Sequence, residues 1–309
     1  MWWFTCKKSP ASEKSYSSGG SLVQPIQVPV DEIIYGYCKK AKTDVQFLGH
    51  SSALRGKIWT GSESGRSILV DNKQPDEPAV FWVIGRISHE DFWLYPDGGL
   101  HGNLKTKLTS HHATAFLTRP SDKALGDLFD AALAIAPLSE SVDRNSAVIT
   151  KDHLVRIKFD ERYLRIKHRI LEIPESDGDV ESELEKTTNE KEKIVAEKWK
   201  EFDDRWTLET LPCRTEYSLD ERNKLIRNNN YGYKWNLLPA YNVQGLPIAP
   251  NQYESMLRGA TVLCHISLCR WEIEKKYSFS PHIVQLRVLI PPSNLPHTPR
   301  KQKRFPMDP

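Results

Sequence analysis

Two segments near the C-terminal end alternate in apolar character and constrain the fold more than any other feature of the chain. In residues 260–270, Val262, Cys264 and Ile266 occupy every second position, and residues 283–290 alternate in the same way. A period of two is typical of β-strands, and apolar residues at the intervening positions indicate that both faces are partly covered. We therefore expect the two segments to form an antiparallel pair of strands.

A second block of strands is predicted between residues 28 and 98. Its apolar runs are rich in β-branched and aromatic residues and are separated by clusters of Gly, Asp, Asn and Pro. The predicted strands are 45–48, 57–59, 67–70, 79–87 and 92–95, and a turn at 97–99 follows them. Because two strands alone are marginally stable, we expect the C-terminal pair to complete this N-terminal sheet.

Three segments have the spacing of helices. The first runs from a cap at Ser121 to Pro137, and the second runs from a cap at Asp160 to Pro174. The third begins at Ser218–Glu221, which has the form of a capping box. The second predicted helix turns a basic face outward, made of Arg162, Arg165, Lys167 and Arg169.

Shifts in composition divide the chain into five segments. They are a disordered N-terminal arm at 1–27, a β-rich block with helices at 28–173, a charged linker and helix at 174–205, a C-terminal β block at 206–292 and a basic disordered tail at 293–309. The length of 309 residues allows one large domain or two ordinary ones. Phe202 and Trp206 belong to a helical repeat, so the end of the linker helix should dock on the fold.

The composition is that of a soluble globular protein, 39% hydrophobic and 27% charged with a formal net charge of +3. The five cysteines are scattered and indicate no disulfide framework, and no apolar run approaches the roughly 18 residues of a spanning helix. Lys7 and Lys8 interrupt the apolar start, which argues against a signal peptide. We expect an intracellular location without a membrane partner, and Arg300–Arg304 is a candidate nuclear address.

Motifs of known enzyme classes are incomplete in this sequence. Residues 61–67 have three residues between two glycines instead of the four of a P-loop, with Arg66 in place of lysine, so we expect a hairpin turn there. Cys264 and Cys269 fall on opposite faces of a strand and cannot form a zinc pair, and Cys264 is predicted in the core. We predict no catalytic residue, cofactor or metal. The sequence favours a protein that is not an enzyme, without deciding the question.

A metal-dependent nuclease stays open as an alternative, because His101, His111 and His112 occur in one segment near Asn103. A metal site needs ligands that converge, and no carboxylate or cysteine pair at a fixed spacing accompanies these histidines. Four carboxylates border predicted strands and are interpreted as solvated turn residues, namely Asp76, Glu77, Glu90 and Asp91.

Basic residues interleaved with aromatic residues favour a different function. Single-stranded nucleic acid is held by a positive groove and by aromatic faces on which bases stack. The chain has nine tryptophans and eleven tyrosines, and its C-terminal block is basic. The candidate contacts to single-stranded DNA or RNA are Arg270, Trp271, Lys275, Lys276 and Tyr277, with Arg162, Arg165 and Arg169 as a second patch. The alternative is a protein-interaction or regulatory module without nucleic-acid binding.

Three stretches of the C-terminal block carry a resemblance to a known family. They are Leu-Pro-Ala-Tyr-Asn-Val-Gln-Gly-Leu-Pro-Ile at 238–248, Leu-Arg-Gly-Ala at 257–260 and Ile-Val-Gln-Leu-Arg-Val-Leu at 283–289. Together with the strand at 77–82, they resemble a family of proteins of unassigned activity that is abundant in mushroom-forming fungi. The family pattern has Asp where this chain has Asn242. This resemblance implies an origin but no activity.

The same block is more distantly similar to the end of the OB-type barrel in phage-like single-stranded-DNA-binding proteins. In those proteins a small turn and a glycine precede a long strand, and a last strand closes the barrel. Gly259 matches that glycine, and no base-contacting residue is carried over. The resemblance implies that the C-terminal block at 206–292 is an OB-like β block. With this resemblance, the sequence predicts an α+β, β-dominated fold. We expect a partly open antiparallel β-barrel or sheet of the OB kind with helical insertions.

Overall fold

The computed structural model describes most of the chain between residues 29 and 293. The described ranges are 29–61, 65–104, 106–142, 149–158, 161–172, 202, 205–228, 232–274 and 276–293. The arm predicted at 1–27, nearly all of the tail predicted at 293–309 and nearly all of the linker predicted at 174–205 lie outside these residues.

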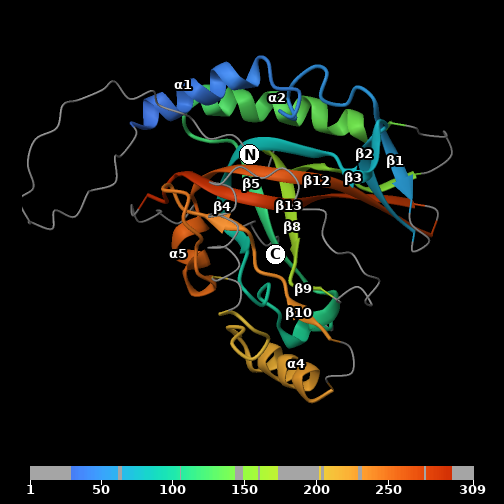
Figure 1. Ribbon diagram of the computed structural model, residues 1–309, viewed down its shortest axis with the longest axis vertical. Helices are drawn as coiled ribbons and strands as arrows, with labels where there is room; N and C mark the ends of the chain where they lie inside the picture. Colours follow the sequence, from blue (N-terminus) through green and yellow to red (C-terminus); the bar gives the residue numbers. More distant parts are fainter. Residues whose placement is uncertain are drawn as a thin grey trace, which may run out of the picture.

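Five strands form a ring at the centre of the molecule (Figure 1). In spatial order they are β4 (Val80–Trp93), β5 (His112–Thr118), β8 (Glu161–Arg169), β13 (Lys276–Ile290) and β12 (Thr261–Ile273), and β12 pairs again with β4. Neighbouring strands are antiparallel except β8 and β13, which are parallel and meet at the single pair Lys167 and His282. The ring is therefore a barrel that is only loosely closed at one seam.

The order of the strands defines the class of barrel. Numbered one to five along the chain, the ring strands follow the spatial order 1-2-3-5-4 and return to strand 1, with strands 3 and 5 parallel. This is the Greek-key topology of the OB fold, a partly open barrel of five strands. The predicted β-dominated, OB-like fold class is confirmed.

Alternation along each strand fills the barrel with apolar side chains. Cys264 of β12 lies opposite Val83 of β4 and Leu286 of β13, and all three are fully buried. The prediction that Cys264 is a core residue is confirmed. A Cβ atom on Gly85 would lie only 2.9 Å from the Cβ of Leu117, so glycine at this position lets β4 approach β5 closely.

Shorter strands extend the ring into a sheet of eleven strands. They are β1 (Lys57–Gly61), β2 (Arg66–Asp71), β3 (Gln74–Pro78), β6 (Ile149–Asp152), β7 (Val155–Lys158) and β11 (Ala240–Tyr241), while β9 (Leu171–Glu172) and β10 (Lys234–Trp235) pair separately. β1 and β2 are antiparallel, with Gly61 opposite Ser67. This pairing confirms the hairpin that was predicted in place of a phosphate-binding loop.

Helices lie on opposite sides of this sheet (Figure 1). On one side α1 (Val30–Ala41) and α2 (Lys123–Ser139) run next to each other, and on the other side are α4 (Glu216–Arg227) and α5 (Tyr253–Leu257). The short 3-10 helices are η1 (Gly102–Leu104), η2 (Leu108–Ser110) and η4 (Pro250–Gln252). Phe129 of α2 is fully buried and reaches the barrel beside Gly85, so α2 contributes to the core.

The prediction of a helix over residues 160–173 was wrong, because residues 161–169 form strand β8. Tyr163, Ile166 and Ile170 are three and four residues apart, which matches the helical template. The same stretch also has a period of two, in which Leu164 and Ile166 are fully buried in the barrel and Arg165 lies on the outer side. Pairing of β8 with β5 and β7 selects the strand.

Two further expectations about the N-terminal block were wrong. Helix α1 occupies residues 30–41, where strands were expected to begin, and residues 45–48 form turns instead of a strand. Phe47 and Leu48 of those turns are nevertheless buried, whereas Val45 is exposed, and Phe47 packs on Trp82 with a ring-centroid distance of 4.5 Å. The predicted strands at 79–87 and 92–95 are parts of one strand, β4.

Helix boundaries differ from the predicted caps by a few residues. Asp122, not Ser121, caps α2, because its Oδ1 accepts a hydrogen bond of 2.9 Å from the backbone N–H of Leu125. Pro137 lies inside the last turn of α2, so it does not end the helix. α4 begins after Thr215, whose hydroxyl oxygen accepts a hydrogen bond from the backbone N–H of Ser218, while the Ser218 hydroxyl oxygen accepts one from the backbone N–H of Thr215. Ser218 is therefore the third residue of the helix, not its cap.

The C-terminal pair of strands completes the N-terminal sheet, as the sequence predicted. β12 pairs with β13 along its length and also with β2 and β4, which belong to the N-terminal block. The barrel therefore takes three strands from residues 28–173 and two from residues 206–292. It does not lie within 206–292 alone. Trp206 docks on Trp235 in an edge contact at 6.0 Å.

Candidate functional site

The outer side of β5 and β8 is the part of the barrel with the most distinctive chemistry. OB folds present their second and third strands, together with the loops after the first and fourth strands, to oligonucleotides and oligosaccharides. In this chain the corresponding elements are β5, β8, the loop over residues 94–111 and the end of the β12–β13 hairpin. We call the loop over 94–111 the first loop.

Strand register determines which side chains lie on this outer side. His112 pairs with Arg169, Thr114 with Lys167, and Phe116 with Arg165. The intervening residues Ala113, Ala115 and Leu117 are buried in the barrel. Paired residues of neighbouring strands project to the same side of a sheet, so the basic side chains of β8 share one face with His112.

Five basic residues meet on this face and around the hairpin, and we call them the cationic cluster. They are Arg66, Arg156, Arg165, Lys167 and Arg169. Asp152 provides partial compensation, because it accepts hydrogen bonds from Arg156 at 2.9 Å and from the Ser278 hydroxyl at 2.7 Å. Asp91 also attracts Arg165. The cluster therefore carries more positive than negative charge.

Burial and mutual repulsion disfavour the positive charges of two members of the cluster, Lys167 and Arg165. Burial lowers the pKa of Lys167 below its usual range, and the neighbouring Arg165 lowers it further. Burial likewise lowers the pKa of Arg165, and the nearby Arg156 adds to that effect. Cations held in this way bind an anion strongly. The anion replaces the water that the buried cations have lost, and it reduces the repulsion between neighbouring cations.

Several buried polar atoms of the same face lack a hydrogen-bond partner among the described residues. They are Nε of Arg66, Arg156 and Arg165, Oγ of Ser280 and Nε2 of His282. Most buried polar groups in proteins are hydrogen-bonded, so a local concentration of unpaired donors needs an explanation. An anion with several acceptor oxygens would satisfy such donors.

Aromatic rings lie beside the cationic cluster. The rings of Trp271 and His282 are 5.3 Å apart, and His282 meets His112 edge to face at 5.9 Å. Arg66 and Lys167 lie 5.9 and 5.8 Å from the Trp271 ring. Trp271 is half-buried, so part of its indole remains available for a further contact.

These residues surround an open groove of about 940 Å³. Its lining includes Arg66, His112, Arg169, Lys234, Trp271 and His282, with Glu172 as an acidic member. Burial and the charge on Lys167 lower the pKa of His112 to about 4, and burial together with the neighbouring His112 lowers the pKa of His282 to about 3. Both imidazoles are therefore neutral at physiological pH.

The first loop is fixed against one end of the groove by the predicted turn at 97–99. The buried carboxylate of Asp97 accepts hydrogen bonds from the backbone N–H groups of Gly99 at 2.9 Å and Arg214 at 2.7 Å. Gly98 has a φ of 64°, and a Cβ atom there would lie 2.7 Å from Ile170 Cδ1. Glycine is required at this position both for the conformation and for the close approach.

The sequence-predicted contact residues separate into two groups. Trp271 and Arg169 line the groove, and Arg165 belongs to the cationic cluster. Arg270 projects from the opposite face of β12, where its guanidinium lies 5.0 Å from the ring of Trp59 and 4.7 Å from that of Tyr277. A period of two places residues 270 and 271 on different faces, so the predicted C-terminal patch is not one surface.

The remaining predicted contacts also lie away from the groove. Arg162 is exposed and lies opposite Ile157, on the other side of β8 from Arg165. Lys276 is exposed at the start of β13, and Lys275 lies outside the described residues.

Several residues on the outer face of β5 and β8 and around the hairpin were not predicted from the sequence to contact nucleic acid. They are Arg66, Arg156, Lys167, His112 and His282, of which Lys167 was assigned to a helix face and His112 to a metal alternative. Alternation of Arg165, Lys167 and Arg169 was the available signal, because it places three cations on one side of a strand.

Two histidines of the nuclease alternative, His111 and His112, contact different partners. His111 forms a hydrogen bond of 3.1 Å between its Nε2 and the Gly98 carbonyl, whereas His112 faces His282. Within the described residues, no group of three or more His, Cys, Asp or Glu side chains could hold a metal ion.

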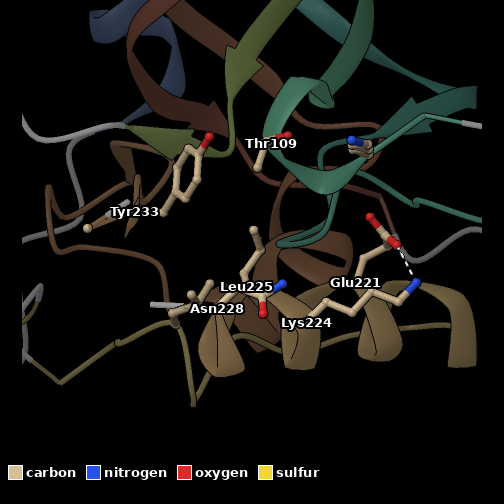
Figure 2. A pocket seen from close by; sticks show the side chains of 9 residues that line it. Thr109, Glu221, Lys224, Leu225, Asn228 and Tyr233 are labelled. Atoms are coloured by element: carbon tan, nitrogen blue, oxygen red, sulfur yellow. Dashed lines mark hydrogen bonds and ion pairs between the residues drawn. The ribbon is translucent and has the colours of Figure 1, made fainter. Parts of the chain in front are cut away.

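A smaller pocket of about 470 Å³ lies between α4 and η2, and it shares Thr109 with the groove. Figure 2 shows Leu225 pointing from α4 toward the side of the pocket that holds Thr109 and Tyr233. Lys224 and Glu221 form an ion pair of 2.9 Å at its lower edge. These two charges neutralise each other, so Lys107 supplies the net positive charge of this lining, whereas the groove has Arg66, Arg169 and Lys234 against Glu172 and is the stronger anion site.

No helix in the described ranges is long and apolar enough to cross a membrane.

Comparisons with known proteins give structural similarity only. No family model matches the chain, and no curated protein matches it. Among solved structures, the chain is similar to gp2.5, a single-stranded DNA binding protein encoded by bacteriophage T7, with a TM-score of 0.35, 10% identity and coverage of 71% of this chain and 90% of that chain. It is also similar to the single-stranded DNA-binding protein from bacteriophage Enc34 in complex with single-stranded DNA, with a TM-score of 0.33, 6% identity and coverage of 79% and 99%.

Proposed function

We propose that this protein binds single-stranded nucleic acid, DNA or RNA, in the groove between the first loop and the β12–β13 hairpin. The observation that carries the proposal is the cationic cluster, whose charges are incompletely compensated, are half-buried except for that of Arg169, and include Arg66 and Lys167 beside Trp271. Neighbouring like charges that are partly removed from water destabilise the unliganded protein. A polyanion with flat bases would offset this destabilisation.

The backbone of the ligand is recognised by the basic side chains. Arg66, Arg165 and Lys167 present donors whose pairing within the described part of the protein is incomplete, and phosphate oxygens supply acceptors for them. Such contacts are independent of sequence and release counterions, which makes affinity fall as salt concentration rises.

Trp271 supports selection of single strands. An unpaired base can stack on an exposed part of an indole, whereas the bases of a duplex are already stacked on one another. Arg66 and Lys167 lie within 6 Å of that indole, so a stacked base and its phosphate can be bound by neighbouring side chains. His282 beside Trp271 is neutral and adds a polar aromatic surface.

The test is a titration of the full chain with a fluorescent thymine oligonucleotide at two salt concentrations, with a matched duplex as competitor. We expect saturable binding that prefers the single strand and weakens with salt. Trp271→Ala should weaken binding by roughly tenfold, within the range for loss of one stacked base. Tyr35→Ala removes a 72% exposed aromatic ring from α1 and should leave affinity unchanged.

Absence of saturable binding at low salt would overturn the proposal and leave the protein-interaction module as the better explanation. Equal affinity for the duplex would overturn the stacking component, because a duplex cannot present free bases to Trp271.

A further inference from the structure

Trp93 lies at the end of β4, on the same outer face as the cationic cluster. It pairs with Thr114 of β5, which pairs with Lys167 of β8, which in turn lies beside His282 of β13. Cross-strand partners project to the same side, so this row leads from Trp93 across the sheet to the edge of the groove. Phe92, the residue before it, is buried in the barrel.

The indole of Trp93 is exposed although it is large and apolar. Its exposed fraction is 43%, and it is the only tryptophan among the exposed large apolar side chains in the described part of the chain. The other tryptophans of the ring strands differ: Trp82 is fully buried, and Trp271 is half-buried in the groove. Packing in the core therefore does not account for Trp93.

The first loop fixes the ring of Trp93 from one side. Gly99 has a φ of 68°, and a Cβ atom at this position would lie 2.6 Å from Cε3 of Trp93, so the loop backbone lies against the indole. Tyr95 meets the same ring edge to face at 6.4 Å. Tyr95 is itself fixed by Arg214, whose guanidinium lies 3.7 Å from the ring centroid, and by a hydrogen bond of 3.1 Å to Glu254.

We propose that Trp93 is a second base-stacking platform, so that the bound strand runs from Trp271 across Lys167 to the first loop. This inference rests on the proposed function and extends the site to the far side of β5. A rigid aromatic ring with one supported face and one exposed face loses little conformational entropy when a base stacks on it. Lys167 lies between the two platforms in the strand row and is placed to contact the phosphates that connect their bases.

If Trp93 is a second platform, the loss of affinity in Trp93→Ala depends on the length of the oligonucleotide. A short thymine oligonucleotide that fills only the groove should bind wild type and Trp93→Ala equally. A longer oligonucleotide, of about ten nucleotides, should bind Trp93→Ala about tenfold more weakly than wild type. Trp93→Phe keeps an aromatic ring and should restore most of the affinity, and Tyr35→Ala, which removes an exposed ring from α1, should have no effect.

Cross-linking gives a second measurement that needs no variant. A thymine oligonucleotide containing 5-bromouracil should cross-link under ultraviolet light to the peptide that carries Trp93, as well as to the peptide that carries Trp271. Binding by wild type with no length-dependent loss in Trp93→Ala and no Trp93 cross-link would overturn this inference and leave the proposed function intact. Absence of binding by wild type at low salt would overturn both.

Discussion

Replacement of Lys167 by methionine should weaken ligand binding and stabilise the folded protein at the same time. Lys167 and Arg165 are two residues apart on one side of β8, which corresponds to about 6.6 Å along a strand. If the two charged groups keep this backbone spacing, they repel each other by about 2.5 kcal/mol at an effective dielectric constant of about 20. Attraction to Asp152 offsets part of this repulsion, so we expect Lys167→Met to raise the free energy of unfolding by about 1 kcal/mol.

The effect on binding follows from the number of phosphate contacts. Within the described residues, Arg66, Arg165, Lys167 and Arg169 form no ion pair, and four contacts predict a slope of log K against log salt of about −2.8 for a single strand. Affinity should then fall about 50-fold between about 50 and 200 mM salt. Removal of one contact reduces the slope to about −2.1, and the fall to about 20-fold.

Fluorescence anisotropy with a thymine oligonucleotide at several salt concentrations measures the slope, and urea denaturation measures the stability. Arg162→Met is the matched control, because it removes one charge from the other side of β8. An equal change of slope in both variants would show that net charge alone governs binding. Destabilisation by Lys167→Met would refute the claim that the cluster repels itself.

Three further predictions concern protonation and helix capping. His168 and His265 have pKa values lowered to about 4, mainly by burial, so the stability that depends on their neutral forms is present above about pH 6.5 and is lost as pH falls toward 4. Urea denaturation at pH 7 and pH 4.5 should differ by several kcal/mol, and a flat pH profile would contradict this. A bound polyanion should raise the low pKa values of His112 and His282, so oligonucleotide affinity should increase between pH 7 and 5 after correction for unfolding. Thr215→Ala removes the cap of α4 and should cost about 1 kcal/mol in urea denaturation, whereas Thr215→Ser should cost much less.

The C-terminal strands could be predicted because their alternation is long and has one interpretation. Residues 260–270 and 283–290 have a period of two over a length that no helix would produce, and they form β12 and β13. Residues 160–173 were ambiguous, because Tyr163, Ile166 and Ile170 have the spacing of a helix. The alternation of Arg165, Lys167 and Arg169 has the period of a strand. Tertiary pairing with β5 decides such cases, and local sequence does not contain that information.

The candidate site was harder to predict because its members come from distant parts of the chain. Arg66 reaches Cys269, which is 203 residues away in sequence, at 3.6 Å. Lys167 meets His282 only because the ring of five strands brings β8 beside β13. Trp271 was predicted from its basic and aromatic surroundings, but Arg270 next to it faces the other side of the strand. Composition indicated the chemistry of the site, and topology determined which residues form it.

Amide hydrogen exchange of the full chain, with and without a saturating thymine oligonucleotide, locates the binding face most directly. The proposed site predicts slower exchange in β5, in β8 and in the β12–β13 hairpin around Trp271, with no change in α1 or in the exposed strand β3. Slower exchange confined to α4 and the smaller pocket, or no change in β8 under conditions where the oligonucleotide is bound, would contradict it.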